Sequence, residues 1–387
     1  MLRAAAVIVT SAVFTLTPMP QKQIITAGPA PVGPYSPAVR AGDFIHVSGT
    51  LAQDDAGQLV ADADAAAQTT HIIERMRGVL KAAGSSLEQV VAVTVYLRQA
   101  SDFAEMNGAY AAFWPKDPPT RTTVITDLLL GADVEISMIA VPAGAERRII
   151  HPEGWSTSPN PYSYAIRSGE TVFLSGLVPR RGRDNSVVTG DIAAQTRAVL
   201  DNAGELLRAA GMDHSNIVSG RVYLPDAANF AGMNEVYRSY FKDARPARAT
   251  VIAGLAGPHF AVEMTFIASA APGEAINPGQ NLSSAIRAGR TLYLSGMLGN
   301  TAANAGDAAA QTRETLARIG KTLGEAGYTP ADVADGLVYL TDLSLFPQMN
   351  DEYRAFFGKD FPARATVGAG LVSPGGVVEI MVTAVKP

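Results

Sequence analysis

The sequence has no cysteine among its 387 residues. This absence excludes disulfide bonds, thiolate catalysis and zinc or iron–sulfur sites built on cysteine. Only five histidines occur, and they lie far apart, without the H-x3-H or HExxH spacing of metal-binding helices. We therefore expect no metal site.

Clusters of positive charge are absent as well. The chain has 31 basic and 36 acidic residues, a net charge of −5, and no block of lysines or arginines. A nucleic-acid-binding face needs such a block, so we expect no nucleic-acid partner. Apolar residues make up 47% of the chain, which excludes global disorder. At roughly 100–200 residues per domain, the length suggests two to four domains.

Only the N-terminus resembles a targeting segment. After Arg3, residues 4–17 are free of charge and largely apolar, and two prolines follow. The run is too short to span a bilayer but has the length of a signal-peptide core. We expect residues 1–20 to direct export, for example to a periplasm, with no membrane attachment after their removal. The alternative is a buried N-terminal strand in a cytoplasmic protein, since no clear A-x-A cleavage site follows.

The rest of the chain repeats itself three times. Each copy carries the same short motifs in the same order, and the spacing from the Met-Asn asparagine to the arginine is 14 residues in all three. The motifs are FIHVSG, VFLSG and LYLSG; three AQT triplets; three VYL triplets; three MNxxY segments; and PTRTTV followed by two PARATV segments. The repeats predict domains at residues 21–145, 146–272 and 273–387.

Each copy predicts the element order ββαβαββ, an α+β unit with helices on one face of a mixed sheet. Two apolar stretches flank a Gly-containing turn, as at residues 41–43, which is typical of a hairpin. Apolar residues at helical spacing over 192–210 predict a long helix that Gly211 ends. The β-branched segment 90–97 and its two counterparts predict a strand. A short helix with Met-Asn follows, and strands at 121–126 and 134–141 end the unit.

The arginine of each PTR or PAR motif opens a predicted strand. These are Arg121, Arg248 and Arg364. A single such arginine would most simply pair with a carboxylate at the edge of the sheet. Its recurrence in three copies favours a site instead, because a rigidly held guanidinium is a natural bidentate partner for a substrate carboxylate.

A glutamate interrupts the apolar final strand of each copy. These are Glu135, Glu263 and Glu379. A carboxylate among apolar residues is costly unless it is paired or used. It either forms a salt bridge with the arginine or holds a water molecule and takes its proton, and both roles are compatible.

Three further polar positions recur. The serines end a strand as Ser-Gly, but no G-x-S-x-G motif and no recurring histidine accompany them, which argues against a serine-hydrolase triad. They either face a pocket or form strand-end turns, and the asparagines either orient a ligand or lie on a helix surface. The residues are Ser48, Ser175 and Ser295; Asn107, Asn234 and Asn350; and Tyr35 and Tyr162, with Leu282 at the third position.

Together these motifs resemble the Rid family (reactive intermediate deaminases, YjgF-type proteins). The carriers are GPYSPAV at residues 33–39, FIHVSG, AQT, MNxxY, PARATV and the VEI strand. The resemblance implies a chorismate-mutase-like trimer with a central barrel and a pocket at each subunit interface. Three copies in one chain would then form an intramolecular pseudo-trimer that stays monomeric.

The same resemblance implies hydrolysis of small 2-imino acids to 2-oxo acids and ammonia without a cofactor. The arginines would bind the substrate carboxylate, the glutamates would hold the attacking water, and the tyrosine, serine and asparagine positions would line the pocket. The chain departs from the family where Gln usually follows Ser-Gly and where a second strand glutamate is usual. These departures leave a second hypothesis, a non-catalytic protein that binds carboxylate ligands.

Overall fold

The computed structural model describes residues 22–28, 30–60, 63–241 and 245–387. The predicted signal peptide, residues 1–20, lies outside the described residues. Within them, none of the helices combines the length and the apolar character that a membrane crossing requires.

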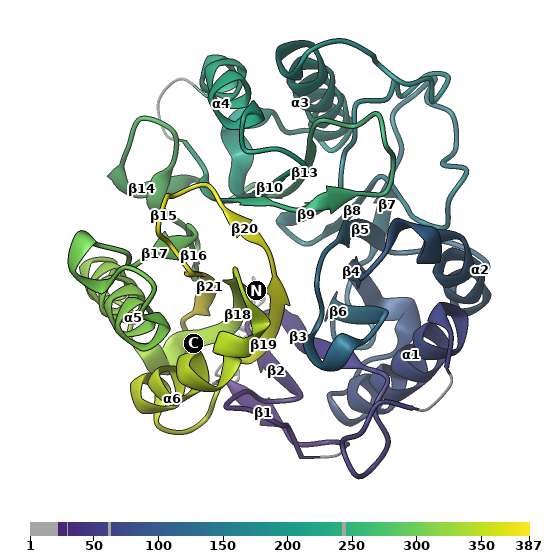
Figure 1. The fold of residues 1–387 in the computed structure, drawn as a ribbon. Coiled ribbons are helices and arrows are strands. Elements are labelled where there is room, and N and C mark those ends of the chain that lie inside the picture. Colours follow the sequence, from purple (N-terminus) through teal and green to yellow (C-terminus); the bar gives the residue numbers. More distant parts are fainter. Residues whose placement is uncertain (1–21, 29, 61–62, 242–244) are drawn as a thin grey trace, which may run out of the picture.

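Three copies of one α+β unit surround a common centre, with their helices on the outside (Figure 1). The first copy comprises β1 Gln23–Ile25, β2 Ala38–Ala41, β3 Phe44–Leu51, α1 Ala65–Ala82, β4 Val90–Leu97, α2 Phe103–Phe113, β5 Thr120–Ile125 and β6 Val134–Ala140. The second comprises β7 Arg148–Ile150, β8 Ala165–Ser168, β9 Thr171–Leu174, α3 Ile192–Ala209, β10 Ile217–Leu224, α4 Asn229–Tyr240, β11 Ala247–Ile252, β12 Gly254–Leu255 and β13 Glu263–Ser269. The third comprises β14 Gly273–Pro278, β15 Ser283–Ala288, β16 Thr291–Leu294, β17 Met297–Leu298, α5 Ala308–Glu325, β18 Val333–Leu340, α6 Phe346–Phe357, β19 Ala363–Gly368, β20 Gly370–Leu371 and β21 Val378–Val385.

The three sheets share one topology. In the first sheet the order is β1-β2-β3-β6-β4-β5-β12, and only β4 and β5 run parallel. This is the predicted ββαβαββ unit with additions: the two-residue strands β12, β17 and β20, and one further strand in every copy. A strand at the start of each copy (β1, β7 or β14) pairs with the first hairpin, and the motif pattern gave no signal for it.

Local chemistry explains the element ends. An aspartate caps each long helix, and Asp64 accepts a hydrogen bond from the backbone N–H of Ala67. Gly211 follows α3 with φ of +77°, a left-handed conformation that glycine adopts without strain. Gly42 plays the same part in the β2–β3 hairpin, with φ of +56°.

The copies join through backbone strand pairing. β12 of the second copy pairs with β5 of the first, and β20 of the third pairs with β11 of the second. At the remaining junction, the N–H of Gly368 donates to the carbonyl of Asp127 over 2.9 Å. Two junctions therefore extend a sheet with a strand of the next copy, the third is held by backbone hydrogen bonding, and together they close a ring.

Successive side chains of the central strands point to opposite faces of each sheet, so the buried core has an outer part under the helices and an inner part at the centre. In β4, Val93 and Val95 pack toward the helices, whereas Tyr96 joins a cluster at the centre. That central cluster takes residues from all three copies, including Tyr223 and Tyr339. The inner faces of the three sheets therefore bury one another.

Candidate active site

Each recurring arginine lies where two copies meet. The backbone N–H of Arg364 donates to Ser48 Oγ over 2.8 Å, although the two residues belong to the third and first copies. Arg121 contacts Ser175 in the same way over 2.9 Å, and Arg248 contacts Ser295 over 2.8 Å. The structure therefore forms three sites, which we name after their arginines.

The partners of each site follow from these contacts. The first copy contributes Tyr35, Ser48 and Glu135 to the Arg364 site. The second contributes Tyr162, Ser175 and Glu263 to the Arg121 site, and the third contributes Ser295 and Glu379 to the Arg248 site. Every site thus combines the arginine and asparagine of one copy with the serine and glutamate of another.

The serine hydroxyls are engaged twice within the protein. Ser48 Oγ accepts from Arg364 N–H and donates to the carbonyl of Ser36 over 2.6 Å. The corresponding bonds of Ser175 and Ser295 are 2.7 and 2.5 Å long. A hydroxyl used in this way fixes the start of the arginine strand against the neighbouring copy.

A tyrosine on the short helix supports each guanidinium. The centre of the Arg364 guanidinium lies 4.7 Å from the Tyr353 ring centroid, and the matching distances for Tyr237 and Tyr110 are 4.5 and 4.8 Å. Such contacts orient a cation while leaving its N–H groups available. These tyrosines recur three residues after each asparagine, so the MNxxY spacing could have assigned them this role.

The arginines are buried, with 1–4% of their surface exposed. Among the described residues, no carboxylate lies within 4.0 Å of any of the three. Burial lowers the pKa of all three guanidinium groups. Each retains one buried nitrogen without a hydrogen-bond partner, namely Arg121 Nη1, Arg248 Nε and Arg364 Nη2. An anionic ligand would satisfy both the charge and the free donor.

The asparagines differ between the sites. Asn107 Oδ1 accepts from Arg121 Nη2 over 2.8 Å, and Asn234 Oδ1 accepts from Arg248 Nη2 over 2.7 Å. Asn350 Oδ1 is buried without a partner, and the amide nitrogen of Asn350, not its oxygen, lies on the side of the free Nη2 of Arg364. Turning this amide by 180° would give Arg364 the same asparagine contact as the other two arginines.

The glutamates lie under the glycine of each Ser-Gly pair. A Cβ on Gly49 would come within 2.0 Å of Glu135 Oε1, and Gly176 and Gly296 stand equally close to their glutamates. Only glycine leaves this space, which gives the recurring Ser-Gly a physical reason that the sequence pattern alone did not. Burial raises the pKa of Glu135, Glu263 and Glu379 to about 8, against the attraction of the site arginine. Each carboxyl is therefore mostly protonated at neutral pH.

One site arginine and its glutamate line a large cavity, whereas the small cavity beside Tyr162 is lined by neither Arg121 nor Glu263. The Arg364 site opens on a cavity of about 480 Å3, which Tyr35, Glu135 and Thr366 line together with Arg75 and Phe346. Near the Arg121 site, a cavity of only about 20 Å3 is lined by Tyr162, Gly176 and Arg180. The first could hold a small metabolite, whereas the second has room for about one water molecule. Neither Arg75 nor Phe346 was singled out from the sequence, although Phe346, like Phe103 and Phe230, stands three residues before the Met-Asn pair of its copy and could have been found by that spacing.

No cluster of three or more His, Cys, Asp or Glu residues that could hold a metal ion occurs in the described part of the chain. The Arg364 site instead offers a free guanidinium donor and a buried carboxyl with a raised pKa around one cavity. This set can bind a carboxylate and move a proton at a neighbouring atom.

Comparison with known proteins gives the same threefold division. The sequence profile of the endoribonuclease L-PSP family matches residues 25–142, 156–270 and 272–386. Over 124 residues the chain is 37% identical to the 3-aminoacrylate deaminase RutC of Acinetobacter baylyi, an overlap of 32% of this chain and 98% of that protein. It is also 37% identical over 103 residues to the human 2-iminobutanoate/2-iminopropanoate deaminase, covering 27% and 75% of the two chains. The crystal structure of the YjgF gene product from E. coli shares 28% identity over 32% of this chain and 98% of that one, with a TM-score of 0.30.

Proposed function

The chain belongs to the endoribonuclease L-PSP family, also called the Rid or YjgF family, and on that premise we propose that it is a hydrolytic deaminase of 2-imino acids. The reaction converts a 2-imino acid and water into a 2-oxo acid and ammonia. The printed names of relatives that match one copy each support this reaction class. The observation that carries the proposal is the pairing of an unsatisfied arginine donor with a buried glutamate at the 480 Å3 cavity.

Substrate binding follows from the free groups of the Arg364 site. The substrate carboxylate accepts hydrogen bonds from Arg364, whose Nη2 has no other partner. The Tyr35 ring, 5.3 Å from the guanidinium centre, covers the bound carboxylate on one side. Val32, Leu129 and Phe346 line the same cavity, so apolar substrate side chains larger than methyl fit there.

Glu135 supplies the proton chemistry. Its neutral carboxyl first gives a proton to the imine nitrogen, which makes C2 more electrophilic. Water then attacks C2, and the Glu135 carboxylate takes one of its protons, giving a carbinolamine. The regenerated carboxyl protonates the amino group, the C–N bond breaks, and the hydroxyl proton returns to Glu135. The products are the 2-oxo acid and ammonia, and the carboxyl ends as it began.

The test is hydrolysis of 2-iminopropanoate generated in the assay from alanine by an amino-acid oxidase. Semicarbazide traps the imine that remains, so an active protein lowers semicarbazone formation and accelerates ammonia release above the spontaneous rate. We expect such acceleration across several apolar 2-imino acids. Saturable binding of a 2-oxo acid without any acceleration would instead support the non-catalytic carboxylate-binding alternative, for which the lost second glutamate is the motivating observation.

A further inference from the structure

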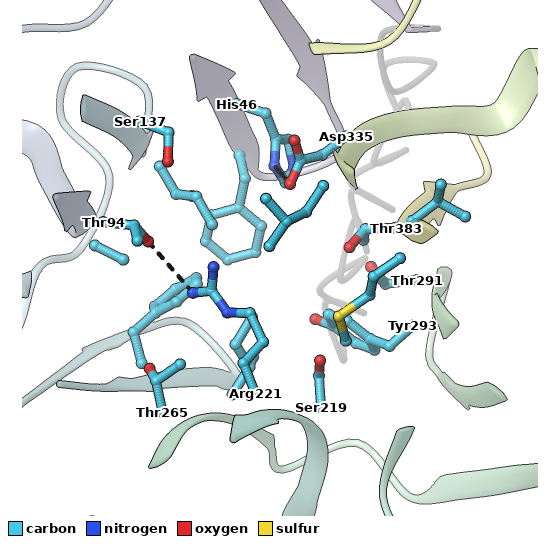
Figure 2. Close-up of a pocket in the computed structure, with 18 of the residues that line it drawn as sticks. His46, Thr94, Ser137, Ser219, Arg221, Thr265, Thr291, Tyr293, Asp335 and Thr383 are labelled. Atoms are coloured by element: carbon cyan, nitrogen blue, oxygen red, sulfur yellow. Dashed lines mark hydrogen bonds and ion pairs between the residues drawn. The ribbon is translucent and has the colours of Figure 1, made fainter. Parts of the chain in front are cut away.

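A second cavity lies at the centre of the molecule, apart from the three arginine sites. Its volume is about 100 Å3, and residues of all three copies line it (Figure 2). None of its lining residues belongs to the cavity of the Arg364 site. Whatever it holds is therefore independent of the proposed deaminase chemistry.

The threefold pattern breaks at this cavity. Thr94, Arg221 and Leu337 occupy the same position on β4, β10 and β18, two residues before the tyrosines of the central cluster. Their cross-strand partners are Ser137, Thr265 and Met381. One copy thus places a cation at the axis where another places a hydroxyl and the third an apolar side chain.

The Arg221 guanidinium makes no close ion pair in the described part of the chain, although the hydroxyls of Tyr223, Tyr96 and Tyr339 and the Asp335 carboxylate raise its pKa against the effect of burial. It extends toward the middle of the cavity, and its one hydrogen bond is a long contact of 3.4 Å from Nη2 to Thr94 Oγ1 (Figure 2). Among the described residues no carboxylate approaches it within 4.0 Å. Asp335 lines the same cavity, but its nearest basic atom is His46 Nδ1 at 3.7 Å. A cation held inside a protein without a close counter-charge is costly.

The remaining lining suits an anion. The hydroxyls of Thr94, Ser137 and Ser219 line the cavity and can turn their O–H groups toward a negative charge, whereas Thr265 already donates its O–H to the carbonyl of Leu174 over 3.0 Å. The volume corresponds to roughly three water molecules, which admits chloride, bromide or formate but no larger organic acid. We propose that the cavity binds one small monovalent anion against Arg221, and that this anion stabilises the ring of three copies.

Thermal unfolding of the full chain tests this proposal. The chloride concentration is raised at fixed pH and constant ionic strength, with gluconate, which is too large for the cavity, as the replacing anion. We expect the melting temperature of the wild type to rise with chloride, because a ligand of the folded state stabilises it. Arg221→Leu, which copies the residue of the third repeat, should lose this response. Thr94→Val should weaken it, and Arg183→Leu, at an exposed arginine of the same copy, should leave it unchanged.

Crystals of the wild type grown in sodium bromide give a second readout that does not depend on any variant folding. We expect an anomalous bromine peak in contact with the Arg221 guanidinium. Density for water alone bridging Arg221 and Asp335 would overturn the proposal. So would chloride responses of equal size in wild type and Arg221→Leu, even if bromide enters at crystal concentrations.

Discussion

The Arg364 and Arg121 sites contain the same recurring residues but differ in the space around them. Both have an arginine over a helix tyrosine, a second tyrosine, a bridging serine and a neutral glutamate. One opens on a cavity of about 480 Å3 and the other borders one of about 20 Å3. The same motif residues therefore stand beside cavities of different size, and the surrounding loops account for the difference.

One pair of equivalent loop residues accounts for part of this difference. Gln53 and Arg180 begin corresponding loops, where they form isolated bridges with Leu59 and Val187. The Gln53 amide folds back onto its own loop and donates to the carbonyl of Gly57 over 2.8 Å. Arg180 instead lies over the Phe260 ring, 5.3 Å from its centroid, and lines the small cavity. We infer that Arg180 and Phe260 narrow the Arg121 site.

The largest expected effect is that of Glu135→Gln, which removes the proton donor of the open site. We expect kcat on 2-iminopropanoate to fall by about 100- to 10,000-fold, the usual contribution of general acid–base catalysis. Glu263→Gln, the matched change at the Arg121 site, should leave kcat within about twofold of the wild type. A similar fall in kcat in both variants would show that both sites contribute to turnover.

The role of Glu135 as the first proton donor also predicts how the rate of the wild-type protein depends on pH. The raised pKa keeps Glu135 protonated below about 8, and the first step needs this proton. The wild-type rate should therefore be highest below pH 8 and decline as pH rises through this value. A rate that rises through pH 8 would mean that Glu135 acts first as a base.

Arg364→Lys should have the next largest effect, because lysine keeps the charge but loses the bidentate geometry. Loss of one charge-assisted contact costs about 1.5–3 kcal/mol, which corresponds to roughly a ten- to hundredfold fall in kcat/KM. Arg121→Lys is the matched control and should change kcat/KM less than twofold. Losses of about one third in each arginine variant would contradict a single working site.

The smallest effect is expected from Arg180→Gln, which gives the second copy the residue of the first. If Arg180 narrows the Arg121 site, its removal should open a second active pocket and raise kcat by up to about twofold. The gain should persist as residual activity in an Arg364→Lys background. Arg183→Gln, at an exposed arginine of the same loop, serves as the control. An unchanged kcat in both backgrounds would show that residues other than Arg180 keep the Arg121 site closed.

Much of the fold could be predicted because its signals are local. The strands at Val90–Leu97, Ile217–Leu224 and Val333–Leu340 follow directly from β-branched runs, and Asp caps and Gly stops mark the long helices. The first strand of each copy is only three to six residues long. It carries no motif of its own, so its pairing with the hairpin depends on tertiary contacts.

The site was predictable in its residues but not in its geometry. Recurrence in register identified the arginines and glutamates, yet it could not tell that Arg364 joins Glu135 of the first copy rather than Glu379 of its own. That pairing depends on how the sheets meet in space. The comparison of repeats did not identify Arg221 at all, because the equivalent residues in the other copies are Thr94 and Leu337.

The junctions between copies have a consequence for how such a protein can change over generations. In an assembly of three identical chains, any substitution appears three times at once, so an arginine at the axis would bring three like charges together. Here each of the three copies can mutate separately. Thr94, Arg221 and Leu337 therefore occupy equivalent positions around the axis with only one positive charge among them. A single chain of three linked copies can therefore keep one pocket under selection while the other two change and take on other functions.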